Sequence, residues 1–183
     1  PEARDHFRKA QQLEPGFAMA YWGEAMTHDH PIWGQHAQEK GGNILQELDQ
    51  QIAEDNVQWS EREKKYVDAI RILYNDNWEM DERRKKYAAA MNELYAAHPS
   101  DESLAFSSLA SMTVPSYNYS SPDVDDVVPI AAKLEKLYKR NPEHPGGMHY
   151  LIHLYDNDTF AQLGLRPARD YASVAYSSSH AIH

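Results

Sequence analysis

One spacing recurs three times along this chain: small or apolar residues separated by four and then three positions, with a proline five positions further on. The three sets are Ala3-Phe7-Ala10-Pro15, Tyr87-Met91-Leu94-Pro99 and Ile130-Leu134-Leu137-Pro142. Steps of four and three keep side chains on one face of an α-helix. A proline ends such a helix because it lacks the backbone N–H donor. The spacing therefore predicts three helices, each packed through one face and each ended by its proline.

Most of the remaining chain also has helical periodicity, and no alternating run is long enough to suggest a strand. Ser60 and Glu63 have the spacing of a capping box, which predicts a helix to about residue 74. Loops are expected over residues 31–37 and 113–122, where proline and glycine or polar residues replace the helical pattern. Further helices are expected over residues 17–26, 41–53, 81–97, 101–112, 123–140, 149–155 and 166–175. The sequence thus predicts an all-α protein.

The recurring spacing is typical of the second helix of a tetratricopeptide repeat, a unit of about 34 residues built from two antiparallel helices. Tyr21 and Ala25 fall where the first helix of the next repeat has an aromatic and a small residue. The three prolines lie 84 and 43 residues apart, and neither separation is a multiple of the repeat length. We therefore expect residues 1–183 to form a single tetratricopeptide-like helical solenoid domain with irregular repeats.

Composition narrows the range of partners. The chain has 28 acidic and 18 basic residues, a formal net charge of −10, and it has no cysteine. So acidic a chain, with no basic stripe, repels phosphate backbones, which excludes nucleic acid as a partner. No apolar run approaches the ~20 residues of a membrane-spanning helix. The chain also begins at Pro1 inside an expected helix, so we expect it to be a fragment of a longer protein.

Two segments resemble those of a group of bacterial tetratricopeptide-repeat proteins. Residues 17–26, FAMAYWGEAM, resemble the segment AMAYWGxAM, and residues 144–153, HPGGMHYLIH, resemble HPGxxHYLIH. Residues 163–169 and 180–183 match further parts of the same proteins, whereas Gly147-Met148 replaces their usual pair of alanines. The resemblance implies a helical-repeat fold and an extracytoplasmic location, in the periplasm or envelope. It implies no particular reaction.

The ten histidines are clustered. Spacings of three or four residues place two imidazoles on one helical face, where they can share Zn²⁺ or another transition metal with a third ligand. The candidate metal ligands are His149, His153, His28, His30, His180 and His183. Tyr150 occupies the position of the general base in the motif H-E-x-x-H, so this is not that zinc-protease motif. Alternatively, the histidines cap helices and line a polar groove.

Aromatic residues are the other candidates for a binding role. A ligand groove lined by aromatic side chains would use Tyr21, Trp22, Trp33 and Tyr150. The alternative is that these large side chains pack between repeat helices.

Two functions follow from these patterns. The first is a scaffold that binds a peptide, protein or small ligand in a concave groove, with no catalytic residue assigned. The alternative is a metal-dependent enzyme of the hydrolase type, in which the clustered histidines hold the ion. We expect the scaffold, and a protein or peptide as its partner. The sequence leaves the oligomeric state open.

Overall fold

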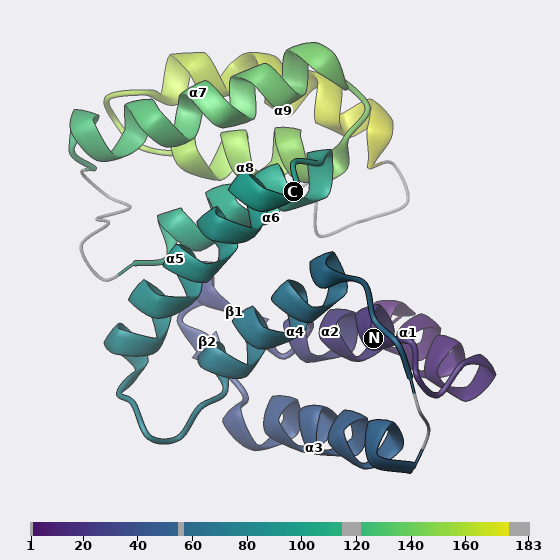
Figure 1. The fold of residues 1–183 in the computed structure, drawn as a ribbon. Coiled ribbons are helices and arrows are strands. Elements are labelled where there is room, and N and C mark those ends of the chain that lie inside the picture. Colours follow the sequence, from purple (N-terminus) through teal and green to yellow (C-terminus); the bar gives the residue numbers. More distant parts are fainter. Residues whose placement is uncertain (1, 55–56, 115–121, 176–183) are drawn as a thin grey trace. The chain divides into compact units, whose positions relative to one another are not determined.

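The computed structural model describes residues 2–54, 57–114 and 122–175, and within these ranges the chain is mostly helical (Figure 1). The helices are α1 (Glu2–Leu13), α2 (Ala18–Met26), α3 (Gln38–Glu54), α4 (Glu61–Leu73), α5 (Met80–Ala97), α6 (Asp101–Met112), α7 (Val124–Arg140), α8 (Pro145–Tyr155) and α9 (Ala161–Val174). The all-α prediction is confirmed. In the described ranges no helix is both long and apolar enough to cross a membrane.

The three proline-ended helices form where the spacing predicts them. Helices α1, α5 and α7 end at Leu13, Ala97 and Arg140, in each case two residues before the proline of the set. The reason is local, because a proline disfavours helical geometry in the residue before it. The apolar residues of the second and third sets are buried, as a face packed against neighbours requires.

Helix starts also follow local chemistry. Ser60 accepts a hydrogen bond from the backbone N–H of Glu63, and the Glu63 carboxylate accepts one from the backbone N–H of Ser60. This capping box starts α4, as predicted. One histidine also serves as a cap: His144 Nδ1 accepts from the backbone N–H of Gly147 at 3.1 Å and starts α8.

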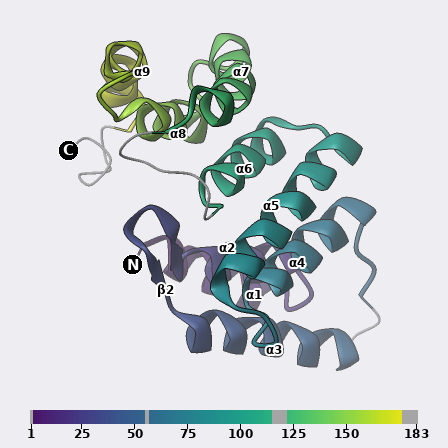
Figure 2. The ribbon, with the colours of Figure 1, turned by 90° about the vertical axis from the view of Figure 1, so that its left-hand side faces the viewer.

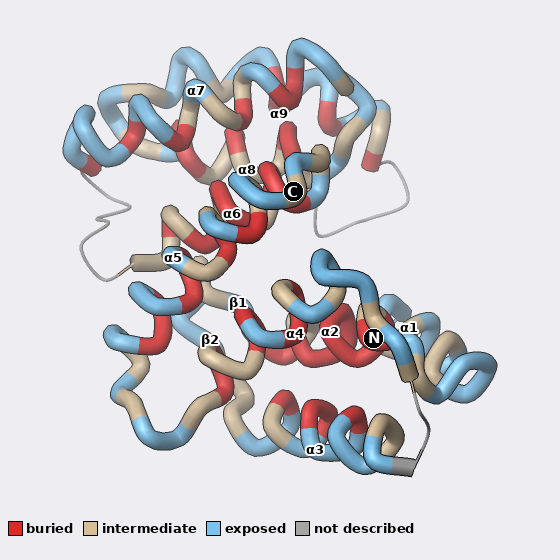
Figure 3. Tube along the Cα trace, viewed as in Figure 1, coloured by how far each residue is buried: buried red, intermediate tan, exposed pale blue. Residues whose placement is uncertain are grey.

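The chain divides into two compact units, Pro1–Ala90 and Met91–His183, with α5 beginning in the first and ending in the second. Each unit has a central helix. In the first unit α1, α3 and α4 all pack against α2, whose residues are buried along most of its length (Figure 3). A methyl group at Gly23 would overlap the ring of Phe7, so glycine allows α1 and α2 to approach closely.

In the second unit the central helix is α8, which packs against α6, α7 and α9. Its buried side chains include Met148, Leu151 and Leu154, none of which is accessible to solvent. Helices α2 and α8 lie within the two segments that carry the family resemblance. Both are apolar on several faces because each is covered on several sides. Whether the two units together form one solenoid domain stays a prediction.

A small hairpin replaces part of the loop predicted over residues 31–37. Strand β1 (Asp29–His30) pairs antiparallel with β2 (Gln35–His36), and the 3-10 turn Pro31–Trp33 joins them. Gly34 has φ of 63°, a left-handed conformation that favours glycine. Strands of two residues are too short to show alternation, so the sequence did not indicate them. The hairpin leads from α2 into α3 (Figure 2).

Two adjacent glycines in α3 provide a matched test of this packing. A methyl group at Gly41 would overlap the ring of Tyr74, whereas Gly42 has open space around it. We expect Gly41→Ala to lower the free energy of unfolding by about 1–3 kcal/mol through overpacking. Gly42→Ala should raise it by about 0.5–1 kcal/mol, because alanine is the better helix former. Urea denaturation of both variants measures the difference, and equal stability of the two would contradict the packing described.

Candidate functional site

The hairpin is held to the helices by a buried ion pair. The Asp29 carboxylate is 1% exposed and accepts two hydrogen bonds from the Arg84 guanidinium, at 2.7 and 2.6 Å. Arg84 lies in α5, 55 residues further along the chain. A buried charge is costly unless it is paired and hydrogen-bonded. The two-point contact therefore ties β1 to α5 in one orientation.

His36, the antiparallel partner of Asp29, extends this pair into a network. Its Nδ1 lies 2.8 Å from Asp29 Oδ1, and its Nε2 lies 2.8 Å from Gln38 Oε1. Arg83 also donates to Gln38 Oε1, while Gln38 Nε2 donates to the Tyr74 carbonyl oxygen at 2.8 Å. These contacts identify the Gln38 oxygen as an acceptor. Both ring nitrogens of His36 are therefore occupied by polar contacts, one with Asp29 and one with Gln38.

Tyr74, the C-cap of α4, connects the network to the central helix. Its ring stacks on His36 with centroids 4.6 Å apart, and its hydroxyl donates to the Ala25 carbonyl oxygen at 2.8 Å. Burial raises the pKa of the Tyr74 hydroxyl, and the nearby Asp29 charge adds to the effect. The hydroxyl thus remains a donor at neutral pH. The network as a whole fixes the start of α3 relative to the end of α4.

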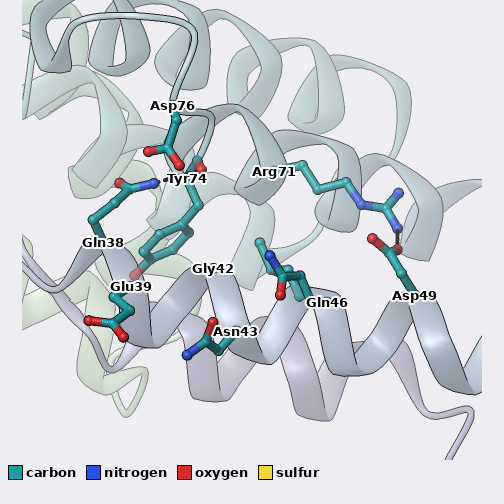
Figure 4. Close-up of a pocket in the computed structure, with 10 residues that line it drawn as sticks. Gln38, Glu39, Gly42, Asn43, Gln46, Asp49, Arg71, Tyr74 and Asp76 are labelled. Atoms are coloured by element: carbon teal, nitrogen blue, oxygen red, sulfur yellow. Dashed lines mark hydrogen bonds and ion pairs between the residues drawn. The ribbon is translucent and has the colours of Figure 1, made fainter.

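A cavity of about 460 Å³ lies between these two elements (Figure 4). We call it the α3–α4 groove. Its lining residues are Gln38, Glu39, Gly42, Asn43, Leu45, Gln46, Asp49, Arg71, Tyr74 and Asp76. The Gln38–Tyr74 contact marks one end, and an ion pair between Arg71 and Asp49 marks the other (Figure 4).

Two side-chain amides in this groove have no hydrogen-bond partner among the described residues. Within the described ranges, no residue forms a hydrogen bond with the side-chain amides of Asn43 and Gln46. They lie on α3 close to Gly42, which has no side chain to cover the helix backbone. Three carboxylates line the groove, of which Asp49 is paired with Arg71 and Asp76 lies 3.5 Å from Arg83, outside the lining. Glu39 forms no ion pair among the described residues. The groove therefore offers free amides in an acidic setting.

The aromatic residues predicted to line a ligand groove lie in different environments. Trp22 is 6% exposed and packs edge-on against Tyr66 in the core of the first unit. Tyr21 is also buried, but its side chain lines a polar cavity of about 390 Å³ beside α1. Trp33, in the hairpin, is 52% exposed. Tyr150, in the second unit, contacts the His149 ring, and burial raises its pKa to about 12. Their role in a ligand groove stays a prediction.

One predicted histidine pair does converge. His149 Nε2 and His153 Nε2 lie 3.1 Å apart on α8, and the His149 ring also contacts Tyr171 of α9. His28 and His30 belong to the first unit, around the hairpin. His180 and His183 lie outside the described residues. In the part of the chain that the structure describes, no group of three or more His, Cys, Asp or Glu side chains could hold a metal ion.

Comparison of the chain with models of protein families, with curated proteins and with solved structures found no match. The fold alone therefore defines the class, an all-α protein with two compact helical units. The tetratricopeptide-like solenoid and the bacterial family stay predictions.

The Asp29–Arg84 pair leads to a stability prediction. Burial would raise the pKa of Asp29, but hydrogen bonds from His36 and Arg84 outweigh it and hold that pKa below its usual value. At neutral pH, Asp29→Asn leaves Arg84 buried without its counter-charge, so the free energy of unfolding should fall by about 3–5 kcal/mol. The exposed change Asp68→Asn is the control and should cost no more than about 0.5 kcal/mol.

The same ion pair makes the free energy of unfolding depend on pH. The pKa of Asp29 is lower in the folded protein than in the unfolded chain, where it is about 4. The ion pair therefore contributes fully to the free energy of unfolding above about pH 4, and this contribution is lost as the pH falls through the pKa of the folded state. Urea denaturation below about pH 4 should therefore show a steeper loss of stability for the wild type than for Asp29→Asn. Parallel profiles for the two proteins would contradict this assignment.

Proposed function

We propose that this chain is a tetratricopeptide-like binding scaffold that holds an extended, basic peptide segment in the α3–α4 groove. The observation that supports it most is the pair of amides, Asn43 and Gln46, that line the groove without partners among the described residues. The three proline-ended helices support the repeat architecture. The proposal concerns binding and assigns no reaction.

The chemistry of the amides suits a peptide backbone. A carboxamide carries one acceptor oxygen and two N–H donors, so it can pair with both the N–H and the C=O of a peptide bond. Such pairing does not depend on the peptide's side chains. Gly42 assists because a backbone can approach an uncovered helix surface more closely than one that carries side chains. The groove of about 460 Å³ accommodates a few residues of an extended chain.

The charge of the groove indicates which peptides bind best. Asp76 and Glu39 border it, and Asp49 lies near its other end, where Arg71 partly neutralises it. Lysine or arginine side chains of a bound peptide would lie close to these carboxylates. Exposed ion pairs contribute about 0–1 kcal/mol each and weaken with salt. The preference for basic peptides should therefore be modest and salt-dependent.

Peptide binding can be tested with fluorescein-labelled short peptides rich in lysine and arginine, compared with the same sequences carrying glutamate instead. The double variant Asn43→Ala/Gln46→Ala should lose two hydrogen bonds of about 0.5–1.5 kcal/mol each. Fluorescence polarisation should then show a Kd raised roughly 5- to 150-fold. Gln50→Ala is the matched control, because Gln50 is exposed on α3 and does not line the groove. Equal affinity of the double variant and the control would contradict the proposal.

The histidine pair supports a second candidate, a metal-dependent hydrolase. Two ligands of one tetrahedral zinc ion, with bonds of about 2.0–2.1 Å, lie roughly 3.3 Å apart. The 3.1 Å between His149 Nε2 and His153 Nε2 is close to that separation. An ion between these nitrogens would take the place of the proton they share. The remaining ligands would be water or histidines beyond the described ranges, and a zinc-bound water would be the nucleophile.

Elemental analysis of tag-free protein after exposure to Zn²⁺ tests this candidate. We expect about one zinc ion per chain if the pair is a site, as a three-ligand catalytic centre holds one ion. His153→Ala should abolish the binding, whereas His6→Ala, an exposed residue of α1, should not affect it. Zinc retained at the same ratio in His153→Ala would contradict the assignment to this pair.

A further inference from the structure

The first unit contains a cavity whose charged lining is entirely basic. It measures about 460 Å³, and its polar lining residues are Arg4, His28, His30, Gln35, His36 and Lys40. Among the described residues, no aspartate or glutamate lines it. This is unusual for a chain whose acidic residues outnumber its basic ones by 28 to 18. We call it the basic cavity.

The two cations of the basic cavity have no carboxylate partner. Arg4 is held at the C-cap of α2, where its Nε donates to Thr27 Oγ1 and a terminal nitrogen donates to the Thr27 carbonyl oxygen, both at 2.9 Å. Within the described ranges, neither Arg4 nor Lys40 forms an ion pair. Arg8, one turn along α1, instead pairs with Glu24 at 2.7 Å. Arg4 is thus positioned by uncharged groups at the end of α2 and not by a carboxylate.

His28 adds a buried polar side chain without a partner. It is 7% exposed and lines the cavity, and no hydrogen bond to its ring comes from any residue that the structure describes. Burial lowers the pKa of His28, Arg4 and Lys40 lower it further, and Glu24 partly opposes them. The ring is therefore neutral at pH 7 and keeps an N–H donor for a ligand. A ligand oxygen in the cavity could accept a hydrogen bond from that donor.

The start of α3 lies beside the cavity, and the Ala37 N–H there donates to the His28 carbonyl oxygen at 2.9 Å. Ala37 lines the cavity and immediately precedes α3, a helix of 17 residues. The first N–H groups of a helix have no partner within it and favour negative charge. Arg4, Lys40 and His28 thus line one space with side-chain donors, next to the start of α3.

We infer that the basic cavity binds a small oxyanion, the terminal group of either a phosphate ester or a carboxylate. A second cavity shares Arg4, His28 and Lys40 but is also lined by Asp5 and Glu47. These carboxylates would repel an extended polyanion, so the ligand carries its negative charge in one compact group. The inference is independent of the α3–α4 groove, because Lys40 and Arg4 do not line that groove.

Isothermal titration calorimetry of the full chain tests the inference, with inorganic phosphate and acetate titrated separately at constant ionic strength. We expect saturable binding of at least one, with Lys40→Gln weakening it about tenfold or more, as for loss of a charged hydrogen bond. Arg4→Gln should act in the same direction. Lys9→Gln, an exposed change on α1 away from the cavity, should bind as the wild type does.

The two anions distinguish the two ligand classes, phosphate esters and carboxylates. Binding of phosphate alone indicates a phosphate ester, and binding of acetate alone indicates a carboxylate. NMR titration of the His28 ring supplies a second readout, since a bound anion should raise the pKa of His28. The inference is overturned if neither anion binds, or if Lys40→Gln and Lys9→Gln bind equally well. Peptide binding in the α3–α4 groove would be unaffected by that failure.

Discussion

The bidentate ion pair between Asp29 and Arg84 is a buried contact that joins the hairpin of the first unit to α5. It fixes a hairpin of two-residue strands, which has too few backbone hydrogen bonds to be stable alone. His36 extends the pair to Gln38 and, through Tyr74, to the carbonyl oxygen of Ala25 in the central helix. The start of α3 and the end of α4 therefore take one relative position. The α3–α4 groove and the lining of the basic cavity both follow from that position.

The two central helices, α2 and α8, explain why two stretches of the sequence contain so few polar residues. Helix α2 is packed against three helices of its unit, and α8 is packed against three of its own. A helix covered on several sides needs apolar or small residues on most faces. At Gly23 the ring of Phe7 in α1 leaves no room for a methyl group. The same reasoning places Trp22 in the core, where it packs against Tyr66. Sequence patterns that resemble a recognition motif can thus result from packing alone.

Local chemistry made much of the fold predictable. The proline-ended helices and the Ser60 capping box depend on residues a few positions apart, and they form where expected. The spacing of His149 and His153 likewise predicted that they share a face of α8.

The partner of Asp29 was not predictable, because Arg84 lies 55 residues away and no periodicity links them. The sequence also did not indicate the unpartnered amides of Asn43 and Gln46. A polar residue on an exposed helical face gives the same sequence pattern whether or not a groove lies beside it. The adjacent glycines Gly41 and Gly42 in α3 could have indicated that a groove lies there.

Peptide binding in the α3–α4 groove would involve the side-chain amides of Asn43 and Gln46 directly. Side-chain amide resonances can be followed directly in a two-dimensional ¹⁵N NMR spectrum while an unlabelled lysine- and arginine-rich peptide is added. We expect the NH₂ signals of Asn43 and Gln46 to shift progressively and saturate together, whereas the signal of Gln50, exposed on the same helix, should stay in place. Saturating shifts confined to other residues, with Asn43 and Gln46 unchanged, would contradict peptide binding in this groove.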